Sequence, residues 1–478
     1  MSDTTDPPPA DGPALHALRQ HHQTTPPDSL EPFDLVVAGG GFAGICAAVT
    51  AARHGLRTAL IHDRPILGGM ASSDVRVGPI GQVDHPPFPR NADVVRQLDS
   101  GIPSSGGVRQ SHNDEQILAL VRAEPLLTCL PETHLHAVDL HHERITSVHV
   151  RNLRTGHTSR LTGTFFADCT GDAHLGLLAG AEWRSGRESR SDTGESLAPI
   201  TADRQVLGNT NYWRCINEPE PVGFPACPWA LPIHSDADFE VSLPKWPVKI
   251  QDMPFVGGWN WESGFFQDAA TEAEAIRDHN LRAIFGTWDW LKNRSPRRHE
   301  LANARLEWIG HILGKRESRR LMGDHILTQH DLEQGRSYPD GCVTATWYFD
   351  LHFPHPENAA RFPGQEFRSM AYDDPHFEQL RGAIPGKYTP IKPYAIPFRC
   401  LYSRTVPNLF MAGRNISVTH VALAPVRTQM TTGMMGTVVG RAAWLCQFLG
   451  VEPRGLYTDH LARLLQVLAD PECEPASL

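Results

Sequence analysis

Residues 33–73 read FDLVVAGGGFAGICAAVTAARHGLRTALIHDRPILGGMASS, a pattern typical of a nucleotide-binding βαβ unit. An apolar strand at 33–38 leads through the G-x-G-x-x-G turn at 39–44 into an alanine-rich helix, and a second strand follows at 57–61. In this turn the first glycine makes the tight bend, the second lets the backbone approach a pyrophosphate, and the third lets the helix pack closely on the strand. The anion sits at the N-terminus of the helix. The stretch therefore predicts a dinucleotide-binding domain.

One position departs from the pattern, because the acidic residue that binds a ribose hydroxyl is expected about 20 residues further on. The end of the second strand carries His62, and Asp63 follows it. Either Asp63 binds the ribose hydroxyls after a small shift, or His62 binds them as a hydrogen-bond partner. The sequence leaves both alternatives open.

The 478 residues are 21% charged and 40% hydrophobic, as in ordinary soluble globular proteins, and are enough for two or three domains. The formal charge of −10, from 44 basic and 54 acidic residues, argues against a nucleic-acid-binding surface. The proline-rich residues 1–30 contain no apolar signal core, and no 18-residue apolar run follows. We therefore expect a cytoplasmic protein that is not inserted in a membrane.

The nine cysteines are dispersed and include no C-x-x-C pair. This arrangement favours reduced core thiols over a disulfide framework, an iron–sulfur cluster or a zinc site, so we expect no metal.

Three later stretches are expected to complete the first domain. Residues 138–161 alternate like a β-meander, TFFADCTGDA at 164–173 is a buried strand that ends in a glycine turn, and NLFMAGR at 408–414 is a late strand and turn.

A helix expected between Pro425 and Leu449 carries Gly433, Gly436 and Gly440 on one face. Because glycine in a helix costs about 1 kcal/mol relative to alanine, this stripe indicates close approach by a backbone or a cofactor, or a tight contact with another helix.

The region 182–395 is rich in tryptophan, histidine and arginine. Apolar spacing predicts one helix over 276–291 and a second over 301–323. On the second helix Glu317 and Arg320 lie in line with the apolar face. They form either a buried ion pair or a surface that faces the substrate.

Two segments resemble FAD-binding sequences. LGGMASS at 67–73 resembles the GG-x-x-S segment of flavoproteins with the glutathione-reductase type of FAD-binding fold, and 164–173 resembles their second FAD fingerprint. Gly171 and Asp172 also look like the G-D motif of flavin monooxygenases, although that motif belongs to the late strand that reaches the ribityl chain. A monooxygenase is therefore an alternative.

Four motifs and one arginine occur here in the order found in the FAD-dependent oxidoreductase family often labelled xanthan-lyase-related. They are WESG at 261–264, GKRESRR at 314–320, WYFDLH at 347–352, AGRNIS at 412–417, and Arg427. The resemblance covers roughly residues 33–450. It implies an α/β protein with a glutathione-reductase-type, Rossmann-like FAD-binding domain and an inserted α+β substrate or cap domain.

The expected divisions are a disordered N-terminal arm at 1–30, the first part of the FAD-binding domain at 31–181, the cap at 182–395, the second part at 396–455, and a C-terminal helix and tail at 456–478. The glycine turn and the resemblance together imply FAD contacts at Gly39, Gly41, Phe42, Ala43, Gly44, Asp63, Arg64, Gly69, Ser72, Ser73, Val138, Thr170, Gly171, Gly413 and Arg414.

No second G-x-G-x-x-G is present, so the flavin is expected to exchange electrons with a small-molecule substrate, oxygen or a redox protein. We expect hydride transfer to FAD from a hydroxylated substrate, a sugar or glycoside by the family's association with polysaccharide degradation. His420 or His352 is the expected base, and Arg427 the charge beside the reduced flavin. The flat apolar faces for a sugar ring are those of Trp259, Trp261 and Trp347. The alternative from another class is a scaffold protein that binds FAD structurally.

Overall fold

The computed structural model describes residues 28–29, 32–83, 85–99, 112–239, 261–371 and 392–472. The predicted N-terminal arm, apart from two of its residues, and Trp259 lie outside these ranges.

A central parallel sheet forms the first half of the molecule, as predicted. Its strands run β4-β3-β2-β7 with β16 also paired to β7. Their bounds are β2 (Phe33–Ala38), β3 (Thr58–Ile61), β4 (Leu127–Leu130), β7 (Thr158–Asp168) and β16 (Leu409–Met411). The strand order reverses at β2, because β3 lies on one side of it and β7 on the other. Such a switch point at the carboxyl ends of parallel strands is where ligands bind in open α/β sheets.

The predicted meander and the predicted buried strand share one long strand. The first half of β7 pairs antiparallel with β6 (Arg144–Asn152), which pairs with β5 (Thr133–His141). The second half of β7 enters the parallel sheet between β2 and β16. The short β1 (Asp28–Ser29) pairs with the start of β7.

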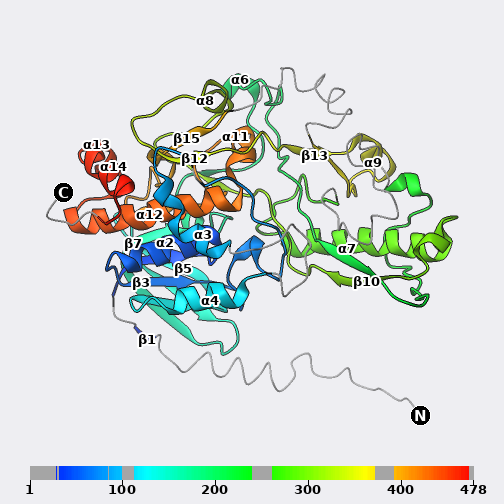
Figure 1. The fold of residues 1–478 in the computed structure, drawn as a ribbon. Coiled ribbons are helices and arrows are strands. Elements are labelled where there is room, and N and C mark those ends of the chain that lie inside the picture. Colours follow the sequence, from blue (N-terminus) through cyan, green and yellow to red (C-terminus); the bar gives the residue numbers. More distant parts are fainter. Residues whose placement is uncertain are drawn as a thin grey trace, which may run out of the picture.

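Two helices far apart in sequence, α2 (Phe42–Arg53) and α12 (Gln429–Leu449), pack directly on each other beside the sheet (Figure 1). The glycine stripe makes this contact possible. A Cβ at Gly436 would overlap the carbonyl oxygen of Ala43, and one at Gly440 would lie 2.6 Å from the carbonyl oxygen of Ala47. Of the alternatives for the stripe, the structure therefore shows the tight helix-to-helix contact.

The other helices of this half are α3 (Asp93–Leu98), α4 (Asp114–Arg122), α5 (His174–Leu178), α11 (His420–Val426), α13 (Pro453–Thr458) and α14 (Leu461–Ala469). The single C-terminal helix expected at 456–469 is thus two short helices.

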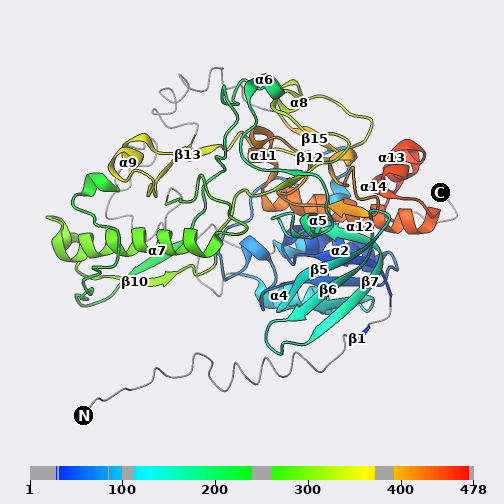
Figure 2. The ribbon, with the colours of Figure 1, turned by 180° about the vertical axis from the view of Figure 1, so that it is seen from behind.

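The second half lies to one side of the sheet, around helix α7 (Ala273–Asp289) and its π-helical continuation at Trp290–Arg294 (Figures 1 and 2). It has its own hydrophobic cluster, centred on Trp213, Trp261 and Trp288. Trp261 is 4% exposed and packs edge-on against Trp213, so it belongs to this core.

The helix predicted over 301–323 is wrong. Residues 304–309 form β10 (Ala304–Ile309), which pairs antiparallel with β9 (Trp213–Asn217), and residues 310–319 are irregular. The apolar residues at helical spacing also alternate along this strand, and pairing with a distant strand decides the conformation.

The remaining short elements join the two halves. They are β8 (Trp183–Arg184), α6 (Arg190–Thr193), β11 (Arg320–Leu321), α8 (Gln329–Gln334), β12 (Gly341–Ala345), β13 (His352–Pro354), α9 (Pro356–Arg361), β14 (Ser369–Ala371) and β15 (Tyr394–Pro397). Buried apolar residues between 321 and 396 pack into the hydrophobic core of the central sheet, so this core extends beyond the expected first domain. None of the helices in the described ranges is long and apolar enough to cross a membrane.

Candidate FAD site

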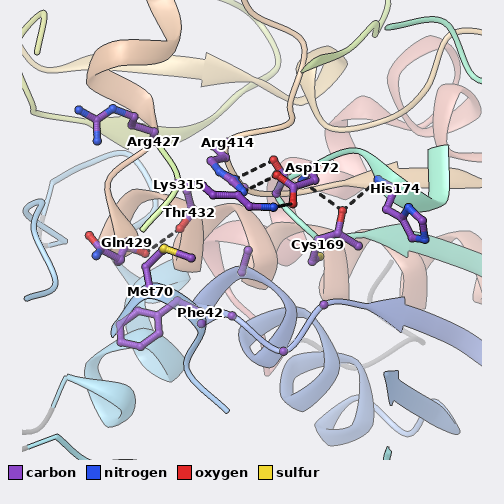
Figure 3. A pocket seen from close by; sticks show the side chains of 18 of the residues that line it. Phe42, Met70, Cys169, Asp172, His174, Lys315, Arg414, Arg427, Gln429 and Thr432 are labelled. Carbon is purple, nitrogen blue, oxygen red and sulfur yellow. Dashed lines mark hydrogen bonds and ion pairs between the residues drawn. The ribbon is translucent and has the colours of Figure 1, made fainter. Parts of the chain in front are cut away.

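A pocket of about 510 Å³ opens at the carboxyl ends of the parallel strands, where β2 leads into α2. Figure 3 shows Arg427 and Gln429 at one end of it, His174 at the other, and Asp172 between them. We call these the Arg427 end and the His174 end. The volume lies in the range of pockets that hold small molecules and cofactors.

The glycine turn forms one wall, and each glycine has the role that the sequence predicts. Gly39 has φ +104°, and a Cβ there would collide with the backbone at Cys169. A Cβ on Gly44 would overlap the carbonyl oxygen of Gly39, so Gly44 serves close packing and does not line the pocket. At Gly41 the nearest chain atom to a Cβ is the Gly69 Cα at 3.9 Å, so the open space beside Gly41 is left for a ligand.

Helix α2 presents its N-terminus to this space. Gly41 caps it without a side-chain hydrogen bond, and no acidic residue occupies the first turn. The free amides and the helix dipole therefore favour a phosphate group there.

The two residues considered for the ribose contact, His62 and Asp63, both line the pocket but differ in their contacts. Both ring nitrogens of His62 are used within the chain: Nδ1 accepts from the Gly40 N–H at 3.1 Å and Nε2–H donates to the Ile66 carbonyl at 3.0 Å. Burial lowers the pKa of His62, which keeps this neutral tautomer. Asp63 has a side chain that is 57% exposed and lines the pocket. Asp63 is thus the more exposed of the two, and its carboxylate lies 3.7 Å from the His62 ring.

The turn after β7 is held by a buried carboxylate. Asp168 is fully buried and accepts hydrogen bonds from the Thr170 hydroxyl at 2.7 Å and the Gly176 N–H at 2.9 Å. The amide of Asn415, in the turn after β16, also donates to Asp168. This bonding ties the turn that carries Thr170 and Gly171 to the turn after β16.

One carboxylate joins two cations in the middle of the pocket (Figure 3). Asp172 accepts from Arg414 Nη2 at 2.7 Å, from Lys315 Nζ at 2.6 Å and from the Ser318 hydroxyl at 2.7 Å. Burial would raise the pKa of Asp172, but Arg414 and Lys315 lower it to about 2. Asp172 is therefore ionised at neutral pH, and its partners here are protein side chains.

Several buried donors on the pocket wall have no acceptor among the described residues. They are Arg64 Nη1, Trp347 Nε1, Arg414 Nε and Arg427 Nε. Buried donors without partners are costly, so these atoms indicate a ligand rich in acceptors. A dinucleotide with phosphate, hydroxyl and ring oxygens has that chemistry. These donors and the open space at Gly41 together fit FAD.

The Arg427 end combines apolar and polar side chains. Met70 lies near it (Figure 3), Val77, Ile80 and Trp347 also line the pocket, and Arg427 donates to Asp350 at 2.7 Å. Arg427 directly precedes α12, whose first residues Gln429 and Thr432 also line the pocket. The arginine and the positive end of a long helix dipole thus lie at one place on the pocket wall.

Most of the predicted site residues lie on the pocket wall. These are Gly39, Gly41, Phe42, Ala43, Asp63, Arg64, Gly69, Thr170, Gly171, Gly413, Arg414 and Arg427. Four predicted contacts do not. Gly44 is a packing residue, the Ser72 hydroxyl donates to the Gly69 carbonyl, the Ser73 N–H donates to Asp114, and Val138 lies too far along β5. The residues of β5 at the pocket are Thr133, His134 and Leu135.

Neither histidine proposed as a base lines the pocket. His352 is 5% exposed, and both of its ring nitrogens contact carboxylates, Nδ1 with Glu262 at 2.7 Å and Nε2 with Asp350 at 2.9 Å. His352 therefore has no free nitrogen to accept a proton from a substrate.

His420 belongs to a second buried cluster. Its Nδ1 contacts Glu317 Oε2 at 2.8 Å, and Glu317 also accepts from Arg320 at 3.0 Å. Glu317 and Arg320 do pair, as one of the two alternatives proposed, although they lie on an irregular segment and a short strand. Neither of them lines the pocket.

Sequence reasoning missed several pocket residues. They are Thr133, His134, Leu135, His174, Tyr212, Lys315, Arg316, Arg319, Asp350, Thr428, Gln429 and Thr432. A signal existed for Lys315, Arg316, Arg319 and Asp350, because they stand inside the GKRESRR and WYFDLH motifs. No local pattern marks Tyr212 or the β5 residues.

The family model for FAD dependent oxidoreductases matches residues 34–465, and the chain belongs to this family. The protein is accordingly a member of the FAD-dependent oxidoreductases, and its cofactor is FAD.

Solved structures resemble the chain more distantly. A geranylgeranyl bacteriochlorophyll reductase-like protein from Thermoplasma acidophilum is 12% identical over 92% of this chain and 83% of its own, with a TM-score of 0.32. The myxobacterial chondrochloren halogenase is 16% identical over 41% of this chain and 46% of its own, with a TM-score of 0.26. The glycerol-3-phosphate dehydrogenase from Bacillus halodurans, complexed with FAD, is 11% identical over 39% of this chain and 40% of its own, with a TM-score of 0.25.

The match spans less than half of the halogenase and of the dehydrogenase. Similarity this low supports no inference about the substrate.

Proposed function

We propose that this oxidoreductase removes a hydride from a small hydroxylated substrate, such as a sugar or glycoside, at the Arg427 end of the pocket. When bound, FAD supplies the hydride acceptor. The observation that carries the proposal is the Asp350 carboxylate, which lines the pocket and contacts Arg427 at 2.7 Å, on a wall that also includes the apolar face of Trp347. A carboxylate next to an apolar face suits a carbinol, whose hydroxyl needs an acceptor and whose carbon skeleton does not.

Asp350 is held ionised on the pocket wall. Burial would raise its pKa, but His352 and Arg427 lower it well below its usual range. An ionised carboxylate accepts a strong, charge-assisted hydrogen bond from a hydroxyl. Asp350 therefore orients the substrate hydroxyl and accepts its proton as the carbonyl forms. Its low pKa lets it pass that proton on to solvent after the hydride has left.

Three arginines of the wall are paired with carboxylates, which favours a neutral substrate beside them. Arg316 contacts Glu262 at 2.9 Å, Arg319 contacts Asp268 at 2.7 Å, and Arg427 contacts Asp350 at 2.7 Å. Trp347 contributes a flat apolar face and an indole N–H without an acceptor in the described chain. Both features suit a hydroxylated ring.

The test is flavin bleaching in rapid anaerobic mixing with glycosides, polyols, amines and hydroxy acids. We expect reduction by hydroxylated compounds, slowed about 100-fold in Asp350→Asn because the substrate is no longer oriented. Asp139→Asn is the matched control, since Asp139 is an ion-paired aspartate on β5 outside the pocket. Bleaching by amines alone, or a parental rate in Asp350→Asn, would contradict the proposal.

The same preparation distinguishes the two alternatives. Oxidation of NADPH without substrate would indicate a monooxygenase. A flavin that cannot be photoreduced or reoxidised would indicate a structural role for FAD.

A further inference from the structure

Five charged side chains form an unbroken buried chain, which we call the charge ladder. Its contacts are Arg427 to Asp350 at 2.7 Å, Asp350 to His352 at 2.9 Å, His352 to Glu262 at 2.7 Å, and Glu262 to Arg316 at 2.9 Å. Signs alternate along it when His352 is protonated.

The ladder begins and ends at the pocket but passes behind it. Arg427, Asp350 and Arg316 line the pocket, whereas His352 and Glu262 do not. Glu262 is fully buried and gives one oxygen, Oε1, to both His352 and Arg316. The ladder thus ties the start of α12 to the second half of the molecule through a single histidine.

His352 must carry two protons to complete the ladder, because a carboxylate faces each ring nitrogen. Burial lowers the pKa of His352, but Glu262 and Asp350 more than offset this, so the pKa is raised above its usual value. The charged groups that face it in the described structure are Glu262, Asp350 and Arg316, with Arg427 beyond Asp350. With the imidazolium the ladder has a net charge of +1, and with neutral imidazole it has none.

We propose that His352 is a positioning residue whose proton gives the ladder its net positive charge, and that this charge makes bound FAD easier to reduce. Reduction adds negative charge to the flavin, and Arg427, Asp350 and Arg316 bring the ladder to the pocket wall. If His352 loses its proton, one nitrogen can no longer donate, and a carboxylate loses its partner. The inference concerns the cofactor and does not depend on the substrate.

The test is the midpoint potential of the FAD-loaded protein, measured anaerobically against reference dyes from about pH 5 to about pH 10. At low pH we expect the midpoint potential of the parent to be higher than that of His352→Gln. At high pH, where parental His352 is neutral, the two potentials should become equal. His279→Gln is the matched control, because both His279 nitrogens contact neutral groups, the Ser263 hydroxyl and the Gln365 carbonyl. Its curve should superimpose on that of the parent.

Coincident curves for the parent and His352→Gln, or a gap that stays constant with pH, would overturn the proposal. A second measurement applies even if His352→Gln does not fold. Histidine-labelled parent protein should show an imidazolium NMR signal at about pH 8, where ordinary histidines with pKa about 6.5 are neutral. This signal should be lost in Glu262→Gln. No imidazolium at that pH would equally overturn the proposal.

Discussion

The two walls of the pocket are built by different means. The wall at Gly39, Gly40 and Gly41 is main chain, kept open by the lack of side chains, and it comes from one continuous stretch. The opposite wall consists of charged side chains from several segments, including Asp172, Lys315 and Arg427. A backbone wall depends on local spacing, whereas a charged wall depends on partners far away in sequence. Substitutions should therefore act differently on the two.

The largest effect is expected on the backbone wall, at Gly41. Gly41→Asp places a carboxylate where the pyrophosphate approaches, and like charges at a binding surface cost several kcal/mol. FAD should bind about 100-fold more weakly, since each 1.4 kcal/mol is tenfold. Flavin absorbance of the purified protein and titration with FAD measure this loss.

Gly41→Ala is the uncharged control, because it adds a Cβ without a carboxylate. That Cβ meets only the Gly69 Cα at 3.9 Å and leaves the fold intact. It should lose less FAD than Gly41→Asp. A folded Gly41→Asp protein as yellow as the parent would show that the pyrophosphate lies elsewhere.

The next largest effect is expected at the contact between helices α2 and α12, which lies behind the backbone wall. Gly436→Ala would push α12 away from the Ala43 carbonyl of α2 and should lower the free energy of unfolding by about 2 kcal/mol. Urea unfolding measures this change. Gly223→Ala is the control, because a Cβ at Gly223 has no neighbour within 4 Å. Equal stability of the two variants would mean that the helices adjust.

On the charged wall, Arg427→Ala should leave the fold intact but lower the reduction potential and slow flavin reduction. If the reduced flavin loses about 1 kcal/mol of stabilisation, its two-electron reduction potential falls by about 20 mV. Dye-coupled potentiometry checks the shift. An unchanged potential would mean that Arg427 serves only as the ion-pair partner of Asp350.

The smallest effect is a pH dependence of stability through His352. Because the folded-state pKa of His352 is raised above the unfolded value, its proton stabilises the fold fully below about pH 6.5. This contribution is lost as the pH rises through the folded pKa. The difference in unfolding free energy between the parent and His352→Gln should therefore shrink from low to high pH in urea titrations. A difference that grows with pH would contradict the assignment.

The backbone wall was predictable in detail because its requirements are local. The spacing of Gly39, Gly41 and Gly44 gave the correct turn, and the strands on either side follow from short apolar runs. The glycine stripe at 433–440 predicted a close approach, but only the structure identified α2 as the neighbour.

The predictions for the charged wall failed where a residue's role depends on its partners. His352 and His420 were expected at the substrate, yet carboxylates from other segments hold both behind the pocket. The helix predicted over 301–323 is partly a strand, because β9 pairs with it. The roles of His62 and Asp63 also depend on partners, because the Gly40 amide and the Ile66 carbonyl occupy the His62 ring.

The sequence by itself determined the nucleotide-binding unit, the FAD family and the approximate order of the elements, because turn chemistry and apolar periodicity act over a few residues. Only the tertiary structure decided which charges meet. Asp172 joins Lys315 and Arg414, and His352 joins Glu262 and Asp350, across separations of up to 242 residues. A buried charge is stable only with its partner, and that partner is chosen by the packing of the whole chain.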